Sequence, residues 1–198
     1  MQSNQQSNVN TTIVVCVGDW KRSDDNDGQI CYTAIKFKAH PKYSCSTIKN
    51  DIAIIKTPLM NVPYSSSNGF GSTNSICQPT TASYEGKPLI VSGWGRYDRN
   101  GYSLADVLQK APMNFVPLTQ CRQIFPSVDN SQVCVRGPKG QIACNGDSGG
   151  PLFHINNSGF AEAVGIVSFG KSTCPKEGIA VYTSVYAFLD FINSEIKG

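Results

Sequence analysis

The chain has 198 residues, of which 40% are hydrophobic, and a formal net charge of +3. Its basic residues are scattered, so we expect neither a nucleic acid nor an anionic membrane surface as a partner. No apolar run approaches the ~20 residues that a membrane span needs. The length is compatible with one large domain or two small ones.

The eight cysteines point to an oxidising, extracellular compartment. There is no Cys-x-x-Cys pair and there are only two histidines, so neither a metal site nor another cofactor is expected. Residues 1–10 are polar and lack the basic and apolar regions of a signal peptide, and we predict a disordered tail there. This start conflicts with the secretion that the cysteines indicate. A truncated start, an internal fragment or an alternative product would explain the conflict.

The first predicted elements are two strands, at 11–20 and 29–37, joined as a hairpin by the charged loop 21–28. Cys16 and Cys31 lie on these neighbouring strands and are candidates for a disulfide.

An apolar strand follows Asp51, where an unpaired carboxylate would be costly to bury, so this residue is expected to have a partner. Residues 58–85 are loop-like and typical of a linker. Further strands are predicted at 89–95, 104–115, 163–170 and 179–185, with a short helix at 119–125 and an amphipathic helix at 186–197.

The strongest signal is the stretch CNGDSGGPL at residues 144–152. Glycines on both sides of Ser148 predict a backbone turn that leaves the serine uncovered and lets a substrate come close. In such a turn the N–H groups of Gly146 and Ser148 can converge on an anion. A nucleophile beside an oxyanion hole is the geometry that acyl transfer needs.

This stretch resembles the Gly-Asp-Ser-Gly-Gly-Pro motif of the trypsin/chymotrypsin-like serine protease family. Residues 39–43, 50–56 and 89–95 resemble other family landmarks in the right order. The resemblance implies an all-β fold of two packed antiparallel Greek-key barrels and a C-terminal helix. Residues 11–85 would be an incomplete first barrel with a linker, and residues 86–198 the second barrel and helix.

The same resemblance implies a secreted serine endopeptidase that acts on polypeptides and is bound by protein inhibitors. Ser148 would be the nucleophile and Asp51 the triad carboxylate, with Gly146 and Ser148 as the oxyanion hole. Asp147 would pair with a freed N-terminal ammonium and so order that hole. In the specificity pocket Ile142 would form the base, and Ser168, Gly170 and Ala180 the walls; this favours apolar side chains over Lys or Arg.

The general base is not found. Neither His40, in a His-Pro turn, nor His154, at a position where the family has a disulfide cysteine, matches the family's catalytic histidine. We therefore expect this chain alone to be inactive. Three hypotheses remain open: a peptidase whose upstream segment is missing from this sequence, an inactive binding pseudoprotease, or a gene remnant.

The resemblance also implies two disulfides, Cys121–Cys134 and Cys144–Cys174. Cys77 matches a position that in many members bonds to an upstream pro-segment, and the partner of Cys45 is open. The loop after Asp19 has about the length of the family's calcium loop, but we expect a plain solvated acidic loop, with calcium as the alternative.

Overall fold

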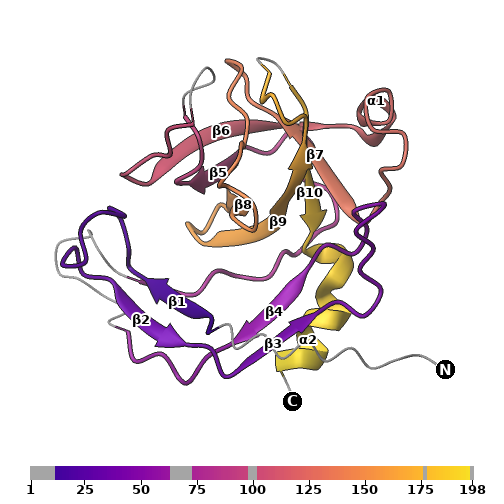
Figure 1. The fold of residues 1–198 in the computed structure, drawn as a ribbon. Coiled ribbons are helices and arrows are strands. Elements are labelled where there is room, and N and C mark those ends of the chain that lie inside the picture. Colours follow the sequence, from indigo (N-terminus) through magenta and orange to yellow (C-terminus); the bar gives the residue numbers. More distant parts are fainter. Residues whose placement is uncertain (1–11, 63–72, 98–101, 176–177, 197–198) are drawn as a thin grey trace.

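Six antiparallel strands form a closed barrel in the C-terminal part of this computed structural model, which describes residues 12–62, 73–97, 102–175 and 178–196 (Figure 1). The strands pair in the order β10-β7-β6-β5-β8-β9. They are β5 (Leu89–Gly93), β6 (Gln109–Val116), β7 (Gln132–Arg136), β8 (Pro151–Ile155), β9 (Ala161–Gly170) and β10 (Ala180–Ser184). The predicted tail 1–10 and part of the predicted linker lie outside the described residues.

Apolar side chains fill the interior of this barrel. Leu89, Met113, Val135, Leu152 and Tyr182 are each at most 1% exposed and come from five different strands. Closure of the sheet leaves no strand with an unpaired edge, and this allows one continuous core.

The N-terminal part forms two separate two-stranded antiparallel sheets. One pairs β1 (Val14–Val17) with β2 (Ile30–Thr33), and the other pairs β3 (Lys36–Ala39) with β4 (Ala53–Lys56). The single strand predicted at 29–37 is therefore wrong. The chain changes partner there: the N–H of Ala34 donates to Ile13 and that of the next residue, Ile35, to Lys56.

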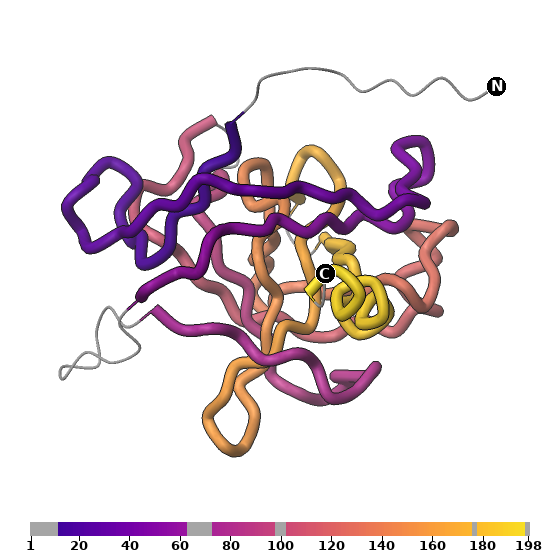
Figure 2. The backbone as a smooth tube through the Cα atoms, turned by 90° about the horizontal axis from the view of Figure 1, so that it is seen from below, coloured from indigo at the N-terminus to yellow at the C-terminus, as the bar shows by residue number. Residues whose placement is uncertain are grey.

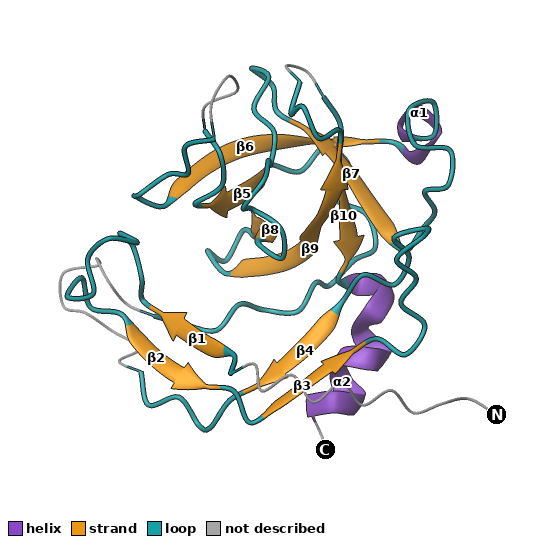
Figure 3. Ribbon diagram, viewed as in Figure 1, coloured by secondary structure: helices purple, strands orange, loops and turns teal. Residues whose placement is uncertain are grey.

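Figure 3 shows these four strands as a curved layer apart from the barrel, and in the view from below the tube of this part of the chain runs across the barrel (Figure 2). Many of their apolar side chains remain exposed, such as Ile35, Phe37 and Ile55. The all-β class with a C-terminal helix is thus confirmed, and the first half is less completely covered than the second.

The last described residues form the 3₁₀ turn η1 (Tyr186–Phe188) and the helix α2 (Leu189–Ile196), and the described part of the chain also contains the short helix α1 (Leu118–Cys121). Helix α2 lies beside the β3–β4 sheet, where Glu195 pairs with Lys38 at 2.6 Å and with Lys36 at 3.5 Å. No helix of the described segments is long and apolar enough to cross a membrane.

Candidate active site

Ser148 lies in a tight turn just before β8 and is exposed to solvent. Gly146 and Gly149 have φ angles of 96° and 81°, which glycine adopts without strain. The turn is held on β9 by two hydrogen bonds of 2.9 Å, from the N–H of Gly149 to Val167 and from the N–H of Val167 to Gly150. The nucleophile candidate therefore sits on a backbone held rigidly by the barrel.

The same turn presents two unused donors. The N–H of Asp147 donates to the Cys144 carbonyl, and that of Gly150 donates to the Asp147 carbonyl. The N–H groups of Gly146 and Ser148, in contrast, make no hydrogen bond to another described residue. Two free N–H groups beside an exposed hydroxyl are what an oxyanion hole requires.

Asp51 reaches the barrel from the other half of the chain. Ser168 Oγ on β9 donates to Asp51 Oδ2 at 2.6 Å, and Thr183 Oγ1 on β10 donates to the Asp51 carbonyl at 2.7 Å. The family resemblance predicts Ser168 in the pocket wall, and the sequence predicts neither of these two contacts. The one available signal for Thr183 is that it is a polar residue in a strand that begins with three residues of apolar or aromatic character, Ala180 to Tyr182.

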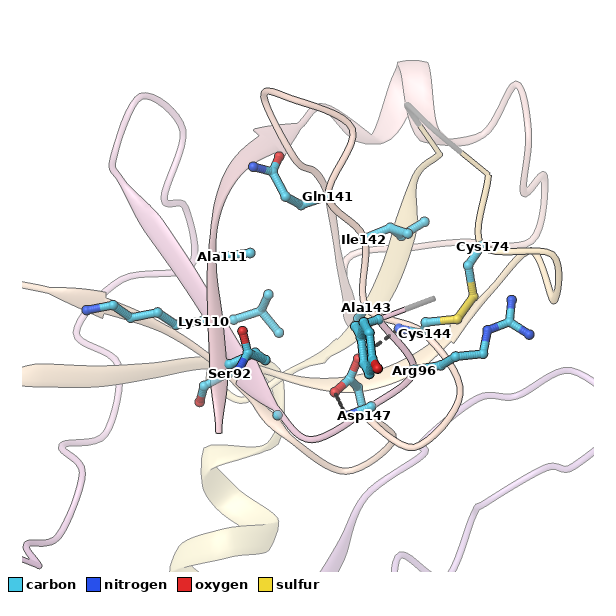
Figure 4. Close-up of a pocket in the computed structure, with 15 residues that line it drawn as sticks. Ser92, Arg96, Lys110, Ala111, Gln141, Ile142, Ala143, Cys144, Asp147 and Cys174 are labelled. Carbon is cyan, nitrogen blue, oxygen red and sulfur yellow. Dashed lines mark hydrogen bonds between the residues drawn. A yellow bond between two sulfur atoms is a disulfide. The ribbon is translucent and has the colours of Figure 1, made fainter. Parts of the chain in front are cut away.

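Two cavities share the Cys144–Cys174 disulfide in their linings. The first, of about 160 Å³, is lined by residues that include Ser148, Ser168, Gly170 and Ala180. The second, of about 260 Å³, is lined by residues that include Ile142 and Asp147 (Figure 4). Ile142, the predicted pocket base, thus borders the neighbouring cavity rather than the one that contains Ser148.

The Asp147 carboxylate is held by backbone N–H groups: Gly95 donates to Oδ1 at 2.8 Å and Cys144 to Oδ2 at 2.9 Å (Figure 4). A Cβ on Gly93 or Gly95 would collide with this carboxylate. Burial, together with the charge of Asp147, raises the pKa of Tyr182. The negative charge before the nucleophile is therefore fixed in place, beside the second cavity.

Both histidines are engaged elsewhere. The ring of His40 packs edge-on against two phenylalanines of η1 and α2, with ring centroids 5.3 and 4.8 Å apart. His154 on β8 is 7% exposed, with Nδ1 2.8 Å from the Pro88 carbonyl and its ring against Tyr84. Neither imidazole bonds to Ser148 or Asp51.

In the acidic loop, Asp27 rather than Asp19 organises the backbone. Its carboxylate accepts N–H groups of Trp20 and Lys21 at 2.7 Å and of Gln29 at 3.2 Å. The bonds from Lys21 and Trp20 lower the pKa of Asp27, whereas burial and the Asp27 charge raise that of Asp19. Among the described residues no three His, Cys, Asp or Glu side chains are grouped to hold a metal ion.

Three disulfides are present: Cys16–Cys31 across the β1–β2 pair, Cys121–Cys134 between α1 and β7, and Cys144–Cys174 beside Ser148. Cys45 and Cys77 are free and exposed.

The family model for Trypsin matches residues 4–192. The chain belongs to the trypsin family. It is 34% identical to Fibrinolytic enzyme, isozyme C, of Lumbricus rubellus, a match that covers 93% of this chain and 78% of that protein. Trypsin II-P29 of Gallus gallus is 31% identical over 93% of this chain and 71% of its own length. For Melanization protease 1 of Drosophila melanogaster the identity is 32% over 91% of this chain, which spans about half of that protein (47%). Membership in the trypsin family confirms the resemblance seen at residues 144–152 and supports a serine endopeptidase class for the chain.

Proposed function

We propose that the chain carries the nucleophile, the carboxylate and the oxyanion hole of a serine endopeptidase that works through an acyl-enzyme on Ser148. Ser148 Oγ attacks the peptide carbonyl while a base takes its proton. The N–H groups of Gly146 and Ser148 bind the oxyanion, and Asp51 orients the base. The observation that carries the proposal is that Ser168 bonds to Asp51 and lines the same cavity as Ser148.

The base in this proposal comes from outside the 198 residues, because His40 and His154 are both held elsewhere. By itself the chain should then be nearly inactive, since loss of one triad member lowers kcat by roughly 10⁴–10⁶-fold. The engagement of both histidines elsewhere also favours a second function, that of an inactive protein that binds polypeptides or inhibitors through the cavity lined by Ser148.

For the enzyme that is completed by a catalytic base, we propose cleavage after apolar residues. Ala143, Val167, Phe169 and Ala180 contribute to the walls of the 160 Å³ cavity, and Lys171 is the charged residue among those that line it. A substrate Lys or Arg would leave water without a counter-charge, which costs several kcal/mol. Peptide libraries that vary the residue before the cut would test this; preference for Arg over Phe or Leu would contradict it.

The three disulfides support secretion, because such bonds persist in oxidising compartments. The exposed thiol of Cys77 is a proposed attachment point for a disulfide-linked upstream segment. Mass spectrometry of the non-reduced native protein would detect that link.

The main test asks whether only the base is missing. The chain is assayed with an activated ester and a fluorophosphonate probe, with and without imidazole in solution, and compared with Ser148→Ala and Asp51→Asn. Ser172→Ala, which alters another serine of the same cavity, is the matched control.

We expect little turnover without imidazole and a Ser148-dependent increase with it. A fast burst without imidazole that Ser148→Ala abolishes would show that the chain has its own base. Imidazole responses equal in Ser148→Ala and the unmodified chain would instead favour the binding function.

A further inference from the structure

The turn before Asp51 holds two unfavourable backbone conformations. Ile48 and Asn50 have φ angles of 51° and 53°, in the left-handed region that residues other than glycine rarely enter. A β-branched isoleucine is especially unfavourable there. Such residues persist where surrounding contacts over-determine the backbone.

Lys49, between these two residues, supplies such contacts. Its Nζ donates to Asp129 Oδ2 at 2.7 Å and to Gln132 Oε1 at 3.0 Å. Gln132 returns a hydrogen bond of 3.4 Å from Nε2 to the Ile48 carbonyl. Gln132 begins β7 and is only 6% exposed, so the lysine bonds to a side chain that the barrel itself holds.

These contacts and those of Asp51 act on one short segment. Asp51 bonds to Ser168 on β9 and Thr183 on β10, while Lys49 bonds to Gln132 on β7. We propose that Lys49 is a positioning residue, which holds the turn 48–51 on the barrel and keeps the Asp51 carboxylate on Ser168 beside the Ser148 cavity. The proposal rests on the proposed function only for what Asp51 does there.

The Lys49 contacts act mainly on the position of the turn 48–51 and contribute little to the stability of the fold. The Asp129 side chain is 52% exposed, and ion pairs with exposed partners contribute little free energy. Lys38 offers a matched control: its Nζ lies 2.6 Å from Glu195 on α2, and its contact also joins the N-terminal half to a later element. Among the described residues, neither side chain of this pair has a hydrogen bond to the turn 48–51.

The test compares Lys49→Met, Lys49→Arg and Lys38→Met in the full chain. The readout is the carboxyl ¹³C resonance of Asp51, which is assigned by its loss in Asp51→Asn. Ser168→Ala gives the position of that resonance without the Ser168 hydrogen bond. Hydrogen exchange at the Ile52 amide, which donates to the Asn50 carbonyl, reports on the turn.

In Lys49→Met we expect the resonance to move at least halfway to its Ser168→Ala position and Ile52 exchange to accelerate at least tenfold. Lys49→Arg should restore both readouts, and Lys38→Met should change neither. An unmoved resonance with exchange within twofold of the unmodified chain would overturn the proposal.

If Lys49→Met does not fold, the variant Asp129→Asn removes the negative charge that pairs with Lys49. The Asp51 resonance and the Ile52 exchange rate then decide the proposal by the same criteria. None of these readouts involves catalysis. If the positioning role of Lys49 is contradicted, the proposed peptidase function is unaffected. If Ser148 proves inactive, the positioning role of Lys49 is unaffected.

Discussion

Both halves of the chain form antiparallel strands that carry apolar side chains, but the halves differ in how completely those side chains are buried. In the closed barrel every residue of β10 is buried, whereas every residue of β3 is exposed. A two-stranded sheet has two free edges and no closed interior, so its apolar residues stay in contact with water. The candidate site spans this difference: Ser148 stands on the covered half, and Asp51 on the half that depends on contacts with it.

Hydrogen exchange should show the largest contrast between the halves. Barrel amides should open only with global unfolding, which costs about 5–15 kcal/mol in typical domains, while β1–β4 should exchange through cheaper local openings. The measurement is exchange mass spectrometry over time, with peptides from both halves. Equal strong protection throughout would contradict the comparison.

Truncation of one side chain in each half should give the next largest difference, in the free energy of unfolding that each truncation costs. Leu152→Ala removes a fully buried side chain from β8 and should cost about 2–5 kcal/mol of unfolding free energy. Phe37→Ala on β3, where the residue is 55% exposed, should change it by no more than about 0.5 kcal/mol. Urea denaturation measures both, and a cost for Phe37→Ala equal to that of Leu152→Ala would mean the first half is better packed than we infer.

Two disulfides give a comparison at nearly equal loop length, since Cys121–Cys134 and Cys16–Cys31 are 13 and 15 residues apart. Chain entropy then predicts a similar loss of about 3 kcal/mol for either bridge. We expect that loss in the global transition when the first pair is changed to serine. For the second pair we expect faster exchange in β1–β2 and a nearly unchanged barrel transition. A full global loss from the second pair would show that the halves unfold as one unit.

The smallest effect concerns pH at the contact between the halves. Burial alone would raise the pKa of Asp129, but hydrogen bonds from Lys49 and Ser131 outweigh it and lower the pKa to about 2. Since the folded pKa lies below the ordinary one, the stabilisation is present above about pH 4 and is lost as pH falls through about 2.

Between pH 4 and pH 2 the unmodified chain should therefore lose more stability than Asp129→Asn, by less than about 1 kcal/mol because the carboxylate is half exposed. Urea denaturation at several acidic pH values compares the two. Parallel curves would show that the ion pair contributes nothing in solution.

Sequence alone determined the features whose causes are local. The turn around Ser148 follows from glycines within two residues of it, and the family follows from a motif of nine contiguous residues, 144–152. Most barrel strands also follow from short apolar patterns, because periodicity acts over a few residues. The all-β class follows from the family resemblance that the motif carries. Asp51 could be selected as a carboxylate in need of a partner, and the family resemblance implies a histidine in that role, but its contacts with Ser168 and Thr183 could not be named.

Only the tertiary structure decided what depends on distant partners. Asp51 meets Ser168 from 117 residues away, and Lys49 meets Asp129 from 80 residues away. Ile142 borders the Asp147 cavity because of how its loop packs, and the predicted strand 29–37 splits because Ile35 finds a different partner strand from Ala34. Short-range patterns set which segments become strands, but pairing and side-chain contacts are chosen by the free energy of the whole assembly, in which each partner is distant in the chain.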